Sequence, residues 1–568
     1  MPMSTLRPHV VLLAAAAVAI VLALRPASAS GAPPGDAPPP AELLPGTLAP
    51  LLLAELAARA GDDVDTDRAV HSYMDAARAH RSSAFARRAA RIAARAARFP
   101  LAVDASGLWH ELDPDDPAAH RMLALMLSRA GRPAEAAAAL RRIARPGDAS
   151  DPGGLETVVR LLRQEPDVDR RIGIMESVAD ADPESRYALA RVLAGSGRLE
   201  RAVGILEVLT REAPREDRFS VTHAMLLHDR GDRDAALEVL AHREAEDGGS
   251  DALLRTYARL LDSAGRHEEA SDRYATLVER RPHDHVARWE LGRLLTRMER
   301  LDDARPHFEM LYRAGEWRDG AWYFTGLIDQ TQEAFDRALR AYRRVRGGVY
   351  YVSARIRTAE IMTDSGQLEW ARRHLAATPR YARGDDVRLY RAESGLLVRA
   401  ELPAEAMGVL DRGLAAYPDD DDLLYSRAMV AERLDRLDVL ERDLRSIIAR
   451  DPEHIDALNA LGYTLADRTD RFEEALDLVE RALALDPNRS YIVDSMGWVL
   501  FRLGRHEEAA DWLRRSHEME ADPVVAAHLG EALWVLGRHD EAREIWESAL
   551  EDDPENEVLL ETIERFGS

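Results

Sequence analysis

The sequence predicts an all-α fold, a superhelical solenoid of about fifteen helix-turn-helix repeats. Three observations predict it. Small residues recur about every 34 positions along most of the chain, which is the period of a two-helix repeat. Each is usually followed about 12 positions later by a second small residue, with a large apolar residue four positions beyond it. The 568-residue chain is 46% apolar and 31% charged, which is typical of an ordered, soluble helical protein.

The last repeat shows the pattern most completely. Gly530 lies in its first helix and Ala542 in its second, and two small residues let the helices approach closely. Trp546 fills the space beside this crossing. Pro554 ends the unit because proline cannot continue a helix. We therefore expect each small first-helix residue to mark the contact between the two helices of its unit.

The positions of these markers set the number of units. The spacing doubles between Ala124 and Ala190, so we expect one degenerate unit between residues 155 and 183. The markers are Ala57, Ala90, Ala124, Ala190, Ala224, Ala258, Gly292, Gly326, Ala359, Ser394, Ala428, Gly462, Gly497 and Gly530.

Turn signals recur between the helices. A glycine ends the first helix and acidic residues open the second at Gly265, Gly504 and Gly537, which suits a left-handed C-cap followed by a helix N-terminus. The pairs Gly248-Gly249 and Gly347-Gly348 predict longer loops, with hinges as the alternative. Prolines are expected to close units at Pro214, Pro282, Pro452, Pro487 and Pro554.

Residues 1–29 have the three parts of a secretory signal peptide. Arg7 gives a positive start, Val10 to Leu24 form an apolar run shorter than a membrane span, and Ala27-Ser28-Ala29 fits a cleavage site. We expect cleavage after Ala29 and no transmembrane span in the mature chain; an uncleaved anchor is the alternative. Residues 30–50 are rich in proline, alanine and glycine and predict a tether.

The charge balance argues against nucleic acid as a partner. The net charge is −24 and every basic residue is arginine, whereas nucleic acid and anionic lipid require a basic face. The acidity reflects a composition bias, or it steers a basic protein surface toward the chain. Cysteine is absent, so no disulfide, thiolate nucleophile or lipidated cysteine can form.

Motifs for catalysis, phosphate loops and zinc sites are absent from the sequence. His267 and His506 each precede two glutamates, but they repeat at corresponding helix starts and are interpreted as structural. Residues 63–67 resemble the start of a calcium loop, but Arg68 and Met74 replace its glycine and glutamate, so a solvated loop is expected. We predict no enzyme activity, cofactor or metal; an enzyme with a repeat appendage is the alternative.

The repeats fall into segments of different regularity, and the last segment predicts a binding groove. Residues 51–186 hold degenerate repeats, 187–345 regular repeats, 346–451 divergent repeats, and 452–568 repeats whose first helices carry aromatic residues and arginine. These residue types dominate the hot spots of protein interfaces. The predicted partner-binding residues on the concave face are Tyr463, Tyr491, Asp494, Trp498, Phe501, Arg502, Glu531 and Trp534, with Trp289 and Tyr323 as an extension.

Trp498 follows the marker Gly497 by one position, so we expect it to point into the groove, with Phe501 and Trp534 beside it at the centre of the patch. Its replacement should then leave stability nearly unchanged. Trp546 occupies the large position of a second helix and should lie in the core. Packing within the solenoid is the alternative for each groove residue.

The repeat pattern resembles that of the tetratricopeptide-repeat (TPR) family over nearly the whole chain. Residues 458–509 and 526–550 look more narrowly like the C-terminal repeats of large TPR proteins of Gram-negative cell envelopes, many of them outer-membrane lipoproteins. One such group comprises the adaptor partners of a periplasmic carboxyl-terminal processing protease. The residues that carry this resemblance are Tyr463, Asp494, Ser495, Trp498, His528, Glu531 and Trp534.

This resemblance implies a non-catalytic scaffold or adaptor of the cell envelope, with other proteins as partners. It would activate a periplasmic protease or present cell-wall hydrolases to it. A scaffold for exopolysaccharide export or outer-membrane assembly is the alternative. The lipidated cysteine of the lipoprotein members is missing here, so we expect an exported protein that is periplasmic or associated with the outer membrane.

Overall fold

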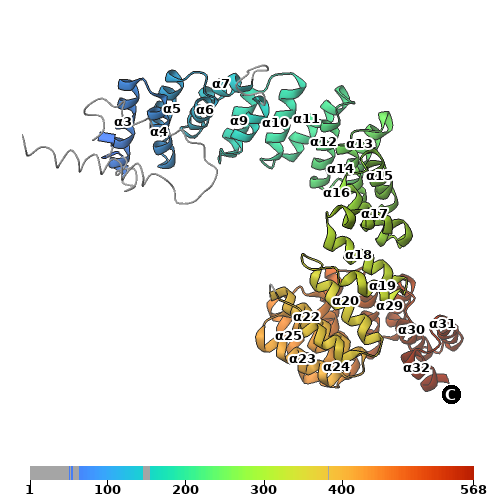
Figure 1. Ribbon diagram of the computed structural model, residues 1–568. Helices are drawn as coiled ribbons and strands as arrows, with labels where there is room; N and C mark the ends of the chain where they lie inside the picture. Colours follow the sequence, from blue (N-terminus) through green and yellow to red (C-terminus); the bar gives the residue numbers. More distant parts are fainter. Residues whose placement is uncertain (1–49, 52, 55–62, 145–153, 381–382, 568) are drawn as a thin grey trace, which may run out of the picture. The chain divides into compact units, whose positions relative to one another are not determined.

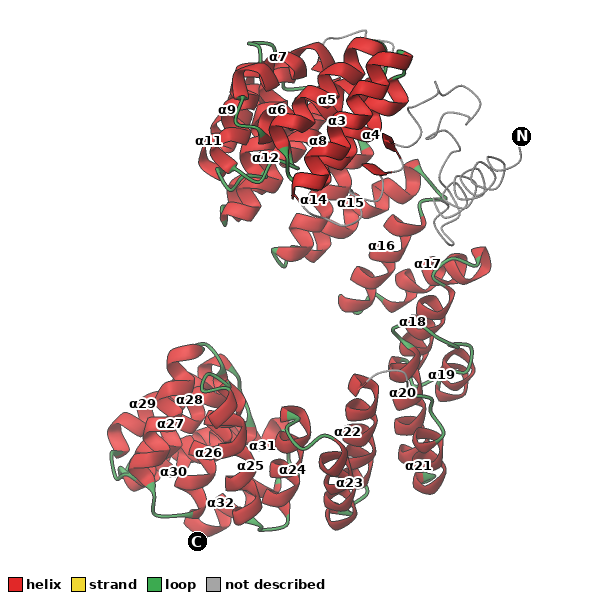
Figure 2. Ribbon diagram, turned by 90° about the vertical axis from the view of Figure 1, so that its left-hand side faces the viewer, coloured by secondary structure: helices red, strands yellow, loops and turns green. Residues whose placement is uncertain are grey.

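The computed structural model describes residues 50–51, 53–54, 63–144, 154–380 and 383–567, which form helices joined by turns (Figures 1 and 2). Within these ranges there is no β-strand. The chain divides into two compact units, residues 1–281 and 282–568. The predicted signal peptide, the tether up to residue 49 and the marker Ala57 lie outside the described residues.

The first compact unit holds helices α3 to α15, which follow one another as pairs in Figure 1. Their bounds are α3 (Asp63–His80), α4 (Ser83–Arg95), α5 (Phe99–Leu112), α6 (Pro117–Arg129), α7 (Pro133–Ala144), α8 (Gly154–Leu162), α9 (Val168–Val178), α10 (Pro183–Ala194), α11 (Leu199–Glu212), α12 (Asp217–Arg230), α13 (Arg233–Asp247), α14 (Asp251–Ser263) and α15 (His267–Arg280).

The second compact unit holds helices α16 to α32. Their bounds are α16 (His285–Arg297), α17 (Leu301–Ala314), α18 (Arg318–Thr331), α19 (Phe335–Tyr342), α20 (Tyr351–Asp364), α21 (Leu368–Ala376), α22 (Arg383–Arg399), α23 (Pro403–Ala416), α24 (Asp421–Arg433), α25 (Leu437–Arg450), α26 (Ile455–Arg468), α27 (Phe472–Leu485), α28 (Ser490–Arg502), α29 (His506–Met519), α30 (Pro523–Val535), α31 (His539–Asp552) and α32 (Glu557–Gly567).

The helices pair as the markers predict. Each described marker lies in the first helix of a pair, and the first helix packs against the second helix that follows it. The doubled spacing after Ala124 is filled by α8 and α9, so the degenerate unit is confirmed. The unit-closing prolines each lie two residues beyond the end of a second helix.

The turn chemistry also agrees with the sequence. Gly265, Gly504 and Gly537 have φ of 76°, 78° and 79°, the left-handed region in which glycine carries no Cβ penalty. The prediction of a loop at residues 63–67 is wrong, because α3 begins at Asp63. Acidic residues are favourable in the first turn of a helix, where they face its positive end.

Close crossing explains why several markers are glycine. A Cβ at Gly326 would lie 2.6 Å from Cε1 of Tyr342, and one at Gly497 would lie 2.5 Å from Cγ of Leu513. A Cβ at Gly530 would overlap Trp546. In each case the clashing residue is the large second-helix residue that the repeat pattern predicts.

We expect Gly497→Ala to destabilise the C-terminal repeats by about 1–3 kcal/mol, because Leu513 must move to make room. The control is Gly408→Ala in α23, where an added Cβ meets nothing within 4 Å. That change should stabilise the chain by about 0.5–1 kcal/mol through helix propensity. Thermal denaturation of both variants measures the contrast, and shifts of the same sign would contradict it.

None of the described helices is both long enough and apolar enough to cross a bilayer.

Candidate functional site

The first helices of the last repeats stack on one another. α26 packs against α28, α28 against α30, and α30 against the terminal helix α32. Their side chains form one continuous set of contacts, which we call the C-terminal face. Its residues are Tyr463 and Asp467 of α26, Asp494, Trp498 and Arg502 of α28, and His528 and Glu531 of α30.

A buried ion pair lies at the centre of the C-terminal face. Nδ1 of His528 is 3.0 Å from Oδ1 and 3.2 Å from Oδ2 of Asp494, and the two residues are only 6% and 7% exposed. The indole of Trp498 stacks on the His528 ring, with centroids 4.2 Å apart and planes 21° from parallel. The Tyr463 ring lies 6.1 Å from the same histidine. The pair therefore bridges α28 and α30 inside an aromatic enclosure.

Burial and the surrounding charges shift the pKa of His528 in opposite directions. Burial on its own lowers the pKa of His528, but the carboxylate of Asp494, with smaller contributions from Glu531 and Asp467, raises it overall. Burial raises the pKa of Glu531. The guanidinium of Arg565, whose Nη2 lies 2.7 Å from Oε2 of Glu531, opposes this rise. The arrangement favours an imidazolium at His528 paired with Asp494.

Tyr491 and Arg502, which we call the rim, are more accessible than the pair, and together with the buried Trp498 they make further hydrogen bonds. Trp498 donates from Nε1 to Oδ1 of Asp467 at 3.3 Å, and Arg502 donates from Nη1 to the backbone oxygen of Asp467 at 2.8 Å. Tyr491, which is 41% exposed, donates its hydroxyl to Asp456 at 2.6 Å. The exposed Tyr491 and the half-buried Arg502 thus lie on the same helix as Asp494 of the buried pair.

Three of the predicted binding residues are buried, and this corrects the prediction about the stability of Trp498→Ala. Trp498, Asp494 and Glu531 do lie on first helices next to their neighbours, but each is buried. Trp498 is 7% exposed because it fills the space between α26, α28 and α30, so the expectation that Trp498→Ala leaves stability unchanged is wrong. A role for these residues in partner binding stays a prediction.

Phe501 lies beside Trp498 as predicted, with stacked rings 5.2 Å apart, whereas Trp534 stacks on Trp546 and lies away from the centre of the face. Each follows its marker by four residues, which on a helix turns it only about 40° from the direction that faces the second helix. Accordingly, Phe501 contacts His506 with ring centroids 5.1 Å apart, and Trp534 stacks on Trp546 at 5.6 Å. Of the predicted residues, Tyr491 is exposed, and Tyr463, Phe501, Arg502 and Trp534 are half-buried.

Three contributors to the face were not among the predicted binding residues. His528 carries the central charge. Asp467 accepts a hydrogen bond from Trp498, and Arg565 donates one to Glu531. A signal was present for His528, which follows Asp494 by one repeat period. The expected extension through Trp289 and Tyr323 belongs to a different cluster: Trp289 stacks on Trp317, and Tyr323 stacks on Tyr350.

The central histidine of the C-terminal face is held by its neighbours. The His528 ring is stacked and paired inside the fold, so it can fix neighbouring helices and hold a proton. Within the described residues there is no group of three or more metal-ligating side chains. The accessible atoms are those of the rim, which offer hydrogen bonds and aromatic contact.

Comparisons with known proteins agree with the repeat geometry. Family models of the tetratricopeptide repeat match residues 257–316 and 441–490, and, with a second model, residues 117–142, 183–207, 218–242, 495–515 and 523–548. The TPR repeat-containing protein PA4667 of Pseudomonas aeruginosa is 33% identical over 519 residues, which span 85% of this chain and 81% of that protein. This chain belongs to the TPR family. Proteins of this family generally mediate protein–protein interactions.

Several solved structures are also similar to this TPR chain. TTC0263, a TPR protein of Thermus thermophilus, is 24% identical over 33% of this chain and 97% of its own, with a TM-score of 0.29. The structure of Pseudomonas aeruginosa pilF is 20% identical over 33% of this chain and 86% of its own, with a TM-score of 0.28. Yeast Tom70 is 14% identical over 92% of this chain and 95% of its own, with a TM-score of 0.33.

Proposed function

We propose that this TPR chain is an exported scaffold that holds another protein on the C-terminal face. One observation carries the proposal: an exposed tyrosine and a half-buried arginine border a buried, aromatic-enclosed ion pair that joins α28 to α30, while Trp498 and Arg502 join α28 to α26. A pre-organised surface of this kind binds without first having to order its own side chains. Tyrosine and arginine are also residue types enriched in interface hot spots.

The finer proposal is an adaptor of the cell envelope that presents cell-wall hydrolases to a periplasmic protease or activates that protease. It is supported by the signal-like pattern of residues 1–29 and by the resemblance of residues 458–509 and 526–550 to envelope TPR proteins. Sequencing the N-terminus of protein recovered from the periplasm tests export: Ser30 is the expected first residue, and an intact Met1 would refute processing.

We expect Tyr491→Ala and Arg502→Ala each to weaken partner binding by about 2 kcal/mol if they act as hot spots. Because both side chains lie on the rim, they should affect folding less than a buried residue would. The measurement is calorimetry of the full-length chain with the carboxyl-terminal processing protease of the same organism, together with the rate of hydrolase cleavage.

The matched control is Arg514→Ala on the second helix α29, where the arginine pairs with Asp511. It removes the same charge away from the C-terminal face and should leave affinity unchanged. Equal losses from Arg502→Ala and Arg514→Ala would show a general charge effect and contradict the placement of the partner on this face.

A further inference from the structure

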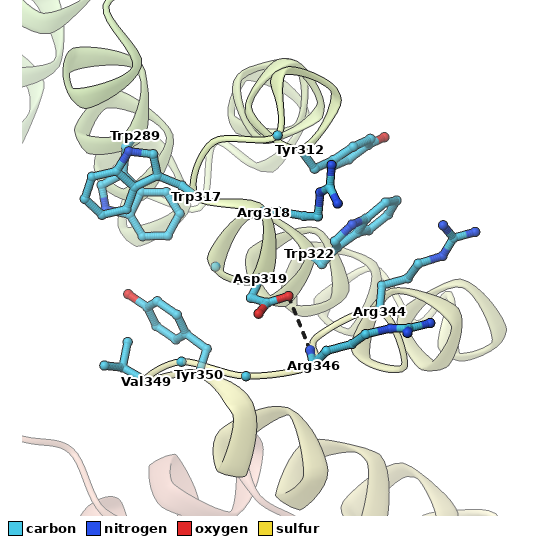
Figure 3. A pocket seen from close by; sticks show the side chains of 14 residues that line it. Trp289, Tyr312, Trp317, Arg318, Asp319, Trp322, Arg344, Arg346, Val349 and Tyr350 are labelled. Atoms are coloured by element: carbon cyan, nitrogen blue, oxygen red, sulfur yellow. Dashed lines mark hydrogen bonds between the residues drawn. The ribbon is translucent and has the colours of Figure 1, made fainter.

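A separate pocket lies within the second compact unit, between two turns. Residues 315–317 join α17 to α18, and residues 343–350 join α19 to α20. Together with Trp289 of α16 these turns line a cavity of about 1010 Å³ (Figure 3). Both turns carry glycine and lack the proline that follows the second helix in the units closed by Pro214, Pro282, Pro452, Pro487 and Pro554.

One half of the pocket is aromatic and apolar. Trp317 stacks on Trp289 with centroids 5.1 Å apart and planes 21° from parallel, and Tyr350 lies 6.0 Å from Trp289 (Figure 3). Trp289 is buried beneath this stack, whereas Trp317 and Val349 are exposed. An exposed indole on a packed aromatic base is a preformed contact for a further ring.

The backbone holds Trp317 in an uncommon conformation. Its φ is 50°, in the left-handed region that bulky side chains rarely adopt. The stack on Trp289 and the hydrogen bond from the backbone N–H of Ala321 to the Trp317 oxygen, at 2.8 Å, fix it there.

The other half of the pocket is cationic. Arg318, Arg344 and Arg346 are exposed, and none forms an ion pair with another residue in the described part of the chain. Arg344 lies 5.2 Å over the Trp322 ring, so one face of its guanidinium is supported. The one carboxylate in the lining, Asp319, accepts a hydrogen bond from the backbone N–H of Arg346 at 3.3 Å (Figure 3).

These arginines differ from those at other turns of the chain. Arg266, Arg505 and Arg538 each form a two-point hydrogen-bonded pair with a glutamate three residues later. In a chain with a net charge of −24, a cluster of arginines without such pairs lacks the carboxylates that guanidinium groups bind most strongly. An occupant that supplies carboxylates would complement this half.

We propose that the pocket binds an acidic peptide segment of a partner protein, with an aromatic side chain placed between carboxylates. The aromatic side chain stacks on Trp317, and the carboxylates pair with the arginines on the opposite side. A small inorganic anion would use only the cationic half and would leave the exposed indole uncovered. The cavity is also at the upper end of the range, roughly 300–1,000 Å³, that holds drug-sized ligands, so it has room for several side chains.

This site lies outside the C-terminal face and is a second point of attachment. It uses residues of α16 to α20 and their turns, whereas the C-terminal face uses α26 to α32. Two sites on one scaffold allow two proteins, or two parts of one protein, to be held together. The two proposals can therefore fail separately.

The test uses the full-length chain and a fluorescein-labelled peptide in which one phenylalanine is flanked on each side by two aspartates. Fluorescence anisotropy should show saturable binding that weakens as salt is raised, because carboxylate–guanidinium contacts are screened. A peptide with alanine in place of phenylalanine, and one with asparagines in place of aspartates, should each bind about 10-fold more weakly or worse.

Variants locate the site. Trp317→Gly removes the indole while glycine tolerates the positive φ, and it should weaken binding about 30-fold. Arg344→Gln with Arg346→Gln should weaken it at least as much, whereas Arg343→Gln, outside the lining, should not. Circular dichroism checks that each variant remains folded.

Four outcomes would overturn the proposal. They are no binding of the probe, equal binding of the alanine peptide, unchanged affinity in Trp317→Gly, and displacement of the probe by inorganic phosphate at concentrations similar to those of the peptide. Loss of binding in Arg502→Ala with full binding in Trp317→Gly would move the peptide to the C-terminal face and equally reject this pocket.

Discussion

Trp546→Ala is expected to lower the local stability of the last repeat by about 3–5 kcal/mol, the range for removing a buried aromatic side chain. Trp546 is 2% exposed, stacks on Trp534, and lies against Gly530, where no Cβ would fit. The large cavity cannot close easily because α30 and α31 are already at close approach. Since repeats contact only their neighbours, the loss should be confined to the C-terminal repeats.

Hydrogen exchange of the full-length chain measures this effect helix by helix. Amides of α30 and α31 should exchange faster in Trp546→Ala, while those of α14 and α15 should be unchanged. The matched control is Trp370→Ala in α21, where the indole is 64% exposed and the change should stay within about 0.5 kcal/mol. Similar exchange in the two variants would contradict the core assignment of Trp546.

The fold could be predicted from the sequence because the repeat reduces it to a local rule. A marker such as Gly497 and a large residue such as Leu513 belong to the same unit, so their contact follows from spacing alone. Even the degenerate unit at α8 and α9 could be placed, because the spacing of its neighbours left room for one pair of helices.

The candidate site could be predicted only in part, because it depends on contacts between units. Spacing places Trp498 one residue after its marker, but its burial depends on how closely α26, α28 and α30 stack. The ion pair of His528 with Asp494 joins side chains one repeat apart, at positions that a pattern of small and large residues does not cover. The pocket beside Trp317 is formed by two irregular turns that the repeat pattern does not describe. The backbone conformation of these turns determines where their side chains lie.

The pH dependence of the C-terminal repeats provides the second large effect. Because Asp494 and its neighbours outweigh burial and raise the pKa of His528, the folded chain binds this proton more tightly than the unfolded chain, in which the pKa is about 6.5. Above pH 6.5 or so the folded form therefore holds more protons than the unfolded form, and stability falls with rising pH. The stabilisation by His528 is complete below about pH 6.5 and is lost as pH rises through the raised pKa.

Asp494→Asn keeps the size of the side chain but removes its charge, which leaves a buried imidazole without its counter-ion. We expect a loss of about 3–5 kcal/mol below pH 6.5 or so, the range for breaking a buried ion pair. The difference in unfolding free energy between the variant and the unaltered chain should narrow at higher pH, because His528 of the unaltered chain also loses its proton there. Burial, the largest single influence on His528, should then lower its pKa, which NMR titration of the histidine ring can follow directly.

Asp477→Asn on α27 is the matched control for this variant. It removes the same charge from the same region, but the Asp477 side chain is largely exposed and lies 3.8 Å from Arg481. An exposed pair of this kind contributes about 0–1 kcal/mol, so the control should lose little stability at any pH. Glu531 also has a raised pKa, but it titrates in both the unaltered chain and the variant. The difference in unfolding free energy between the two chains therefore reports the His528–Asp494 pair. A constant difference between Asp494→Asn and the unaltered chain from pH 5 to pH 9 or so would show that His528 is neutral throughout, and that the pair is joined by a hydrogen bond rather than by charge.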